Sequence, residues 1–244
     1  MRVMGRRLTK KEWVRRRRIK NTIILTLIII LMLCIIGFLA YFPGSILIDY
    51  FSKNANATQV LSPRLLNGLE VKQMYLTPND YSRPQTPLDK VNGIVIHYTA
   101  NPGTSAENNR NYFESLAVKE TTYASSHYIV GLQGEIIQCI PMTEIAYASN
   151  DRNMDTISIE CCHPSETGEF TQETYESLVA LTAALCVEYD LEEEDILRHY
   201  DVTGKLCPLY YVEHEDEWKV FRREVMIKAA ELKSYIDMIK NVKE

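Results

Sequence analysis

The chain has 244 residues, of which 46% are hydrophobic and 24% charged, and its formal net charge is −5. With 10 glycines and 9 prolines it is not a collagen-like or low-complexity chain, and its six cysteines are too few for a disulfide-stapled scaffold. A negative net charge argues against a nucleic-acid partner. The averages describe an ordinary globular domain.

Charge is distributed unevenly along the chain. The first 20 residues hold ten of the 27 basic residues and one acidic residue, Glu12, so residues 21–244 carry a net charge of −14. Residues 22–42 contain no charge, and 21 residues in a helix, at ~1.5 Å each, cover the ~30 Å apolar core of a bilayer. The alternatives are a buried core helix and a cleaved signal peptide. The run is longer than the ~7–15 residues of a signal peptide and ends in bulky Tyr41 and Phe42. We therefore predict a transmembrane helix.

The basic cluster precedes this helix and sets the predicted topology. The positive-inside rule places residues 1–21 in the cytoplasm and everything after residue 42 outside. Residues 43–65 lack a sustained period and are interpreted as a stalk. A single patterned domain follows over residues 66–244. The chain is thus predicted to be a single-pass protein of the cell membrane with an extracytoplasmic domain.

Strand-like and helix-like patterns alternate in this domain. Short β-branched or apolar runs predict strands. They lie at 93–98, 127–131, 135–140, 156–162 and 196–200. Periods of three and four residues predict helices over 172–189 and 215–239. A hairpin is expected between the second and third strands, and helices connect the others, which predicts an α/β fold with a central mixed sheet flanked by helices.

A further helix is expected after the first strand. Thr104 and Glu107 form a capping-box pattern. The helix that they open would place Tyr112, Phe113 and Leu116 on one apolar face.

Two histidines and a cysteine are candidate metal ligands. His97 ends the first predicted strand, and His199 ends the last one, eight residues before Cys207. Two imidazoles and a thiolate form a three-ligand zinc set that leaves a fourth position open, as catalytic zinc sites do. Hydrogen-bonded structural histidines and a core cysteine are the alternative.

The residues around these candidates resemble a known family. Four strings occur in order: IVIHYTANPGTSAENNRNYF, SSHYIVGLQGEIIQCIP, TISIECC and RHYDVTGKLCP. Together they resemble the zinc-dependent N-acetylmuramoyl-L-alanine amidases of the amidase-2 family, over about residues 70–225. That family shares its fold with peptidoglycan recognition proteins, so the resemblance implies a mixed sheet with zinc in a groove on one face.

The resemblance also assigns roles to individual residues. It implies one zinc ion held by His97, His199 and Cys207, with Glu160 and Lys205 as catalytic residues. Glu160 would accept and donate protons, as amide hydrolysis requires, and Lys205 would stabilise the negative charge of the intermediate. A solvent-facing glutamate and an ordinary loop lysine are the alternatives.

Other polar residues carry weaker expectations. His127 and Asn101 are predicted to bind substrate, although His127 also fits a hydrogen-bonded strand residue. Some relatives have a tyrosine where this chain has Ser126, so a tyrosine-assisted mechanism is not expected. Asp201 is expected to orient a ligand or to cap its loop. His163 and His214 are expected at the surface.

Four cysteines of the predicted extracytoplasmic domain are left without a role: Cys139, Cys161, Cys162 and Cys186. Cys139 and Cys186 fit the core, and the adjacent Cys161 and Cys162 are not expected to pair with each other in a strand. Disulfides between more distant cysteines remain open.

The function predicted is that of a membrane-anchored bacterial amidase that cleaves the amide between N-acetylmuramic acid and the L-alanine of the peptidoglycan stem peptide. One alternative is a non-catalytic peptidoglycan-binding module, whose members commonly lack the cysteine ligand. Another is a structural zinc site, which requires a fourth protein ligand from His163 or His214.

Overall fold

A computed structural model describes residues 69–241 of the chain. The predicted cytoplasmic tail, transmembrane helix and stalk, residues 1–65, lie outside the described residues. Within 69–241, no helix combines the length and the apolar character needed to cross a bilayer.

Six strands and five α-helices form the described domain. The strands are β1 (Val71–Gln73), β2 (Ile94–Tyr98), β3 (Tyr128–Val130), β4 (Ile136–Gln138), β5 (Ile157–Cys161) and β6 (Ile196–Arg198). The α-helices are α4 (Ala106–Lys119), α5 (Gln172–Tyr189), α6 (His199–Thr203), α7 (Leu209–Glu213) and α8 (Glu215–Asn241). Two 3₁₀ turns, η1 (Asn150–Met154) and η2 (Glu193–Asp195), complete the described elements.

The strands form one mixed sheet in the order β1-β4-β3-β5-β2-β6. Only β3 and β4 are antiparallel, as the predicted hairpin requires, and the other neighbours are parallel. β2 therefore lies between β5 and β6 with the same direction as both. This arrangement brings the carboxyl ends of β2, β5 and β6 to the same edge of the sheet, where α/β folds place their functional groups.

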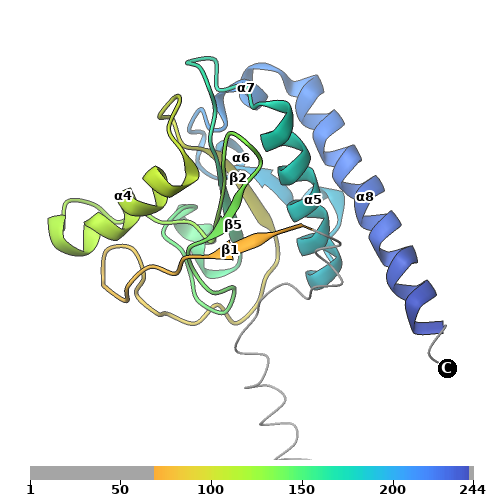
Figure 1. Ribbon diagram of the computed structural model, residues 1–244, viewed down its shortest axis with the longest axis horizontal. Helices are drawn as coiled ribbons and strands as arrows, with labels where there is room; N and C mark the ends of the chain where they lie inside the picture. Colours follow the sequence, from red (N-terminus) through yellow and green to blue (C-terminus); the bar gives the residue numbers. More distant parts are fainter. Residues whose placement is uncertain (1–68, 242–244) are drawn as a thin grey trace, which may run out of the picture. The chain divides into compact units, whose positions relative to one another are not determined.

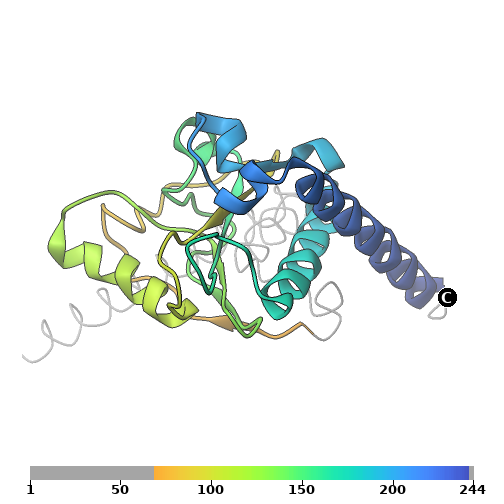
Figure 2. The same cartoon turned by 90° about the horizontal axis from the view of Figure 1, so that it is seen from above.

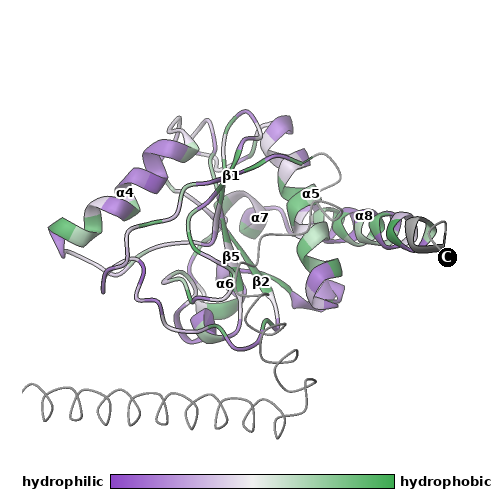
Figure 3. Cartoon of the chain, turned by 60° about the horizontal axis from the view of Figure 1, so that its bottom comes forward, coloured by the Kyte–Doolittle hydropathy of each residue, from purple (hydrophilic) through white to green (hydrophobic). Residues whose placement is uncertain are grey.

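Helices cover both faces of the sheet. Figures 1 and 2 show α4 on one side and the neighbouring helices α5 and α8 on the other. A large apolar cluster on the α5 and α8 side includes Ile94 and Ile96 of β2, and a smaller cluster on the α4 side includes Phe113. Figure 3 shows that the central strands β2 and β5 are hydrophobic whereas α4 is largely hydrophilic. The predicted α/β class with a central mixed sheet is confirmed.

The two long helices match their predictions. α5 has the predicted bounds, and Leu178, Leu181 and Leu185 are fully buried. α8 buries the predicted stripe at its start, with Trp218 and Phe221 at 2% and 0% exposure. An apolar stripe at helical spacing is thus sufficient to identify the face that each helix packs against the core.

The helix after β2 differs from its prediction in cap and face. Ser105, rather than Thr104, is the N-cap, and it forms its capping box with Asn108. The buried face is centred on Phe113 and Leu116, and Tyr112 is 48% exposed. Tyr112 precedes Phe113 by one residue, a rotation of ~100° around the helix, and so lies outside the buried stripe.

The predicted strand over residues 196–200 is shorter than expected. β6 ends at Arg198, and His199 begins the short helix α6 rather than ending the strand. Arg198 is the N-cap, and its backbone N–H donates to the carboxylate of Asp201 at 2.8 Å. This local cap explains the early end of the strand, because it directs the backbone into a helical turn.

Candidate active site

The candidate ligands come from strand β2, from the first residue of α6 and from the loop after α6. His97 is the fourth residue of β2, and His199 follows directly after β6. Because β2 and β6 are parallel neighbours, the two imidazoles meet at one edge of the sheet, with ring centroids 4.6 Å apart. Gly204 ends α6 with a φ of +77°, which favours glycine, and the chain then turns back to Cys207.

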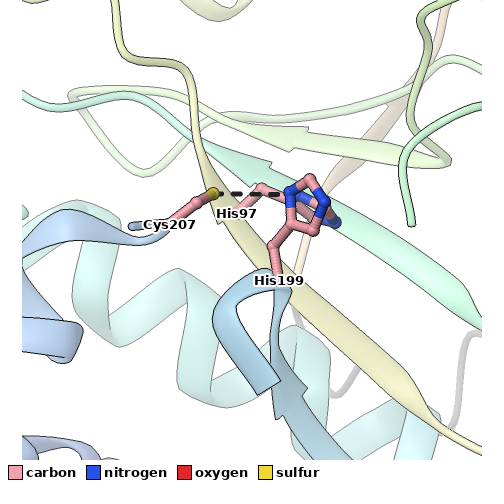
Figure 4. A group of neighbouring side chains, drawn as sticks. All are labelled: His97, His199 and Cys207. Carbon is pink, nitrogen blue, oxygen red and sulfur yellow. Dashed lines mark hydrogen bonds between the residues drawn. The ribbon is translucent and has the colours of Figure 1, made fainter. Parts of the chain in front are cut away.

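The three side chains converge on one point. Figure 4 shows His97, His199 and Cys207 facing one another, with Cys207 Sγ 3.8 Å from His97 Nδ1. One ligand atom from each residue lies within 4.8 Å of the other two. All three residues are buried, at 2%, 7% and 2% exposure respectively. The sequence-predicted trio is therefore assembled in space.

His97 is oriented by a residue that the sequence analysis missed. Its Nε2 lies 3.2 Å from the hydroxyl of Ser149, which is itself 1% exposed. The backbone N–H of Ser149 donates to Asn153 Oδ1, so the loop that carries the hydroxyl is fixed. A partner at Nε2 leaves Nδ1 free for the group formed with Cys207 and His199, as is usual for metal-binding histidines.

Burial sets the protonation of the three side chains. It lowers the pKa of His97 well below the usual value, and His199 and Lys205 lower it further. Burial also lowers the pKa of His199, again with a contribution from Lys205. Both imidazoles are thus neutral near pH 7, the form that binds metals. Burial, with a smaller contribution from Glu160, raises the pKa of the Cys207 thiol to about 12, so a bound cation would have to displace its proton.

The residues present fit a zinc ion. His199 Nδ1 is buried and has no hydrogen-bond partner among the described residues, which a metal bond would satisfy. Two histidines and a cysteine are a donor set that suits zinc. Within residues 69–241, no fourth histidine, cysteine or carboxylate joins the group. The group therefore leaves a coordination position open.

The three residues form part of the lining of a cavity of about 370 Å³, and Glu160 and Lys205 line the same cavity. Glu160 lies on β5 in register with His97 of β2. Its Oε2 atom is buried without a hydrogen-bond partner in the described structure, and burial raises the pKa of this carboxyl to about 8, although Lys205 opposes the shift. Glu160 is thus not the solvent-facing residue of the alternative interpretation. A carboxyl that titrates near neutrality in a cavity suits acid–base chemistry.

An ion-pair network supports the segment that carries His199. Arg198 is 6% exposed and binds Asp201 at 2.8 Å and Glu215 of α8 at 2.6 Å. Its guanidinium also lies over the ring of Trp218. Of the two roles expected for Asp201, capping is the one observed, since its carboxylate accepts hydrogen bonds from Arg198.

The two predicted substrate-binding residues lie apart from the cavity lining. His127 is 1% exposed, its Nδ1 accepts from the backbone N–H of Ser158, and its Nε2 lies 2.9 Å from the carbonyl of Glu144. These contacts fit the alternative of a hydrogen-bonded strand residue. Asn101 is exposed, and its carbonyl accepts a hydrogen bond from the Thr104 hydroxyl. Neither residue lines the cavity.

The buried position of His127 predicts a dependence of stability on pH. Burial lowers the pKa of His127 from 6.5 to about 4, against an opposing hydrogen bond to Glu144. Between pH 6.5 and 4 the unfolded chain binds a proton that the folded chain does not, so stability is lost as pH falls, by up to about 3 kcal/mol. Urea unfolding at several pH values, with His127→Gln as the comparison, checks this. The free-energy difference between the two proteins should shrink toward pH 4, and a constant difference would contradict the assignment.

The remaining histidines and cysteines show one difference from expectation. His163 was expected at the surface but is 1% exposed, because it follows β5 and packs against the ring of Tyr98. His214 is exposed and stacks on Tyr210. Neither belongs to the metal-ligand group. Five described cysteines are free and buried: Cys139, Cys161, Cys162, Cys186 and Cys207.

Comparison with known proteins agrees with the resemblance carried by the sequence motifs. The family model Amidase_2, described as N-acetylmuramoyl-L-alanine amidase, matches residues 87–209. The N-acetylmuramoyl-L-alanine amidase CwlL of Bacillus licheniformis is 37% identical over 170 residues, which cover 64% of this chain and 47% of that protein. The N-acetylmuramoyl-L-alanine amidase BlyA of Bacillus subtilis (strain 168) is 34% identical over 175 residues, with 63% and 46% covered.

A solved structure supports the same relationship. The structure of PlyL matches with a TM-score of 0.56 and 26% sequence identity, covering 64% of this chain and 97% of that one. This chain spans about half the length of the curated relatives that it matches. The similarity therefore concerns the domain that carries the cavity.

Proposed function

We propose, from the premise that this chain belongs to the Amidase_2 family of N-acetylmuramoyl-L-alanine amidases, that its folded domain hydrolyses peptidoglycan. The bond cut is the amide between the lactyl group of N-acetylmuramic acid and the L-alanine that begins the stem peptide. The observation that carries the proposal is the convergence of His97, His199 and Cys207 beside Glu160 in one cavity.

The ligand group is proposed to hold one zinc ion. His97 and His199 would contribute neutral imidazoles, and Cys207 would contribute a thiolate once its proton is displaced. When bound, zinc supplies Lewis-acid activation of water and of the amide carbonyl. Ser149 keeps the His97 ring in the orientation in which Nδ1 faces the other two side chains.

Glu160 and Lys205 are proposed to move the proton and to balance charge. Glu160 accepts a proton from the attacking water and delivers one to the alanine nitrogen as the amide breaks. Its buried, unpartnered Oε2 atom supports this role, since the atom makes no competing hydrogen bond within the described domain. Lys205, which lines the same cavity, places a positive charge where the carbonyl oxygen becomes negative.

The rival proposal is a peptidoglycan-binding module without catalysis. Two features favour the enzyme: Cys207 is present and part of the ligand group, and Glu160 has a pKa raised to about 8 by burial. A binding module needs neither feature. Binding of purified peptidoglycan without release of any product would favour the module.

We also propose that the domain is delivered to the outer face of the cell membrane by the apolar segment 22–42, with residues 1–21 in the cytoplasm. The support is the sequence alone: an uncharged run preceded by ten basic residues. The acidic segment after residue 20 is not expected to bind an anionic wall by bulk charge. Protease treatment of cells without walls tests the topology, because the proposal requires the domain to be digested and the N-terminal tail to be protected.

The experiment that tests the enzymatic proposal uses purified peptidoglycan and the full-length chain in a mild detergent. Stem peptides with new alanine amino groups should be released, a zinc chelator should stop their release, and added zinc should restore it. No release by the zinc-loaded chain would contradict the proposal.

A further inference from the structure

One wall of the cavity is aromatic and carries no formal charge. Phe113, Tyr123 and Tyr147 contribute to the lining, and we name these three residues the aromatic wall. A fourth aromatic lining residue, Tyr98, follows the ligand His97 in the sequence and is not part of this wall. The other lining residues within six positions of Tyr123 or Tyr147 in the sequence are uncharged: Ala124, Ser125, Ala148, Asn150 and Asn153. The two charged lining residues apart from the ligand group are Glu160 and Lys205. The cavity therefore has a neutral aromatic part and a charged part.

The two tyrosines of the aromatic wall are held in place before any ligand arrives. Tyr123 stacks on Tyr81 with ring centroids 5.1 Å apart and meets Tyr147 edge to face at 5.5 Å. The backbone is tied in the same way, since Ala124 N donates to Tyr81 O at 3.1 Å and Ser125 N donates to Tyr147 O at 3.1 Å. A ligand would thus meet ordered rings and lose little free energy to loop ordering.

Tyr123 combines this order with exposure. Its side chain is 60% exposed although it lines the cavity and packs against two other tyrosines, Tyr81 and Tyr147. An ordered, exposed tyrosine at the mouth of a cavity is typical of a ligand-contacting residue, because a large ring offers contact area at low entropic cost.

We propose that the aromatic wall is the binding subsite for the sugar ring of the substrate, with Tyr123 as its main contact. The proposal deepens the proposed amidase function and rests on it for the identity of the ligand. On one side of the cleaved amide the substrate is a neutral pyranose with an apolar C–H face and an acetamido group. On the other side it is a peptide with carboxylates. The neutral aromatic wall suits the sugar, and the Lys205 side suits the anionic peptide.

The test compares two soluble substrates with the same peptide and the same scissile amide. One is a disaccharide muropeptide, and the other is the corresponding lactoyl peptide, which lacks the sugar. Tyr123→Ala in the full-length chain should lower kcat/KM for the muropeptide about tenfold, mainly through KM, and leave the lactoyl peptide within about twofold. Tyr123→Phe should behave as the unmodified chain. Tyr235→Ala, which removes an exposed tyrosine of α8, is the matched control.

Two outcomes for Tyr123→Ala would overturn the proposal. One is an equal loss of kcat/KM on both substrates, which would mean a peptide contact or a change of the whole site. The other is no loss of kcat/KM on the muropeptide. Saturation-transfer NMR with the peptide-free disaccharide gives a readout without catalysis. Its signals should weaken in Tyr123→Ala and persist in Tyr235→Ala. If the unmodified chain cleaved neither substrate, the amidase function would fail, but the binding experiment would still decide the sugar subsite. Disaccharide binding that is unchanged in Tyr123→Ala, or absent in the unmodified chain, would contradict the subsite.

Discussion

Replacing Cys207 with alanine is expected to reduce the zinc content of the purified chain from about one ion to nearly none. The thiolate is the anionic member of the three-residue group, and its loss leaves two neutral imidazoles. Loss of residues that only support a ligand weakens metal affinity about 10–100-fold, so loss of a ligand should cost at least 100-fold. Metal analysis after dialysis against a weak chelator measures the change.

Cys186→Ala is the matched control for this experiment. Cys186 is a buried free cysteine in α5 and does not belong to the ligand group. Both variants lose the same atoms from a buried site, but only Cys207→Ala should lose zinc. Cys207→Asp, which restores an anionic ligand, should recover part of the binding. Equal zinc content in Cys207→Ala and Cys186→Ala would remove Cys207 from the metal site.

Replacing Glu160 with glutamine is expected to lower kcat by about 10²–10⁴-fold while zinc content stays unchanged. The amide has nearly the shape of the carboxyl group but cannot accept a proton from water. Rates of muropeptide hydrolysis, measured together with metal content, separate this effect from loss of the ion. Full activity of Glu160→Gln would exclude Glu160 from the reaction.

Stability supplies a second readout for the same variant. Burial raises the pKa of the partly buried Glu160 to about 8, and its Oε2 atom has no hydrogen-bond partner among the described residues, so the charged form of this carboxyl is costly in the folded state. Glutamine avoids that cost, and the variant should unfold at no lower temperature than the unmodified chain. Glu135→Gln, which changes an exposed carboxylate outside the cavity lining, should alter neither activity nor metal content.

Elements with a strong periodic pattern could be predicted from the sequence. The helix α5 and the buried stripe of α8 follow directly from apolar spacing. The helix α6 could not be predicted in this way, since the Arg198 cap acts locally and overrides the β-like run before it. Tyr112 and His163 were misplaced because their burial depends on which neighbours the fold supplies, and a single sequence does not give this information.

Only part of the candidate site could be predicted from the sequence. The trio of His97, His199 and Cys207 was predicted from strand ends and ligand spacing and was supported by motif resemblance. The parallel pairing of β2 with β6 explains why these distant residues meet. Ser149 carries no sequence signal, since it lies in an irregular loop and acts through one hydroxyl. The aromatic wall was missed too, because Tyr123 and Tyr147 come from separate loops that only the fold brings together.

The most direct test of the central claim identifies the bond that is cut. The full-length chain, loaded with zinc, digests purified peptidoglycan in water enriched in ¹⁸O, and the products are analysed by mass spectrometry. The amidase assignment predicts one ¹⁸O atom in the lactyl carboxylate on the glycan side and unlabelled stem peptides that begin with a free L-alanine amine. Label at a sugar reducing end, label within the peptide, or retained binding with no product would contradict it.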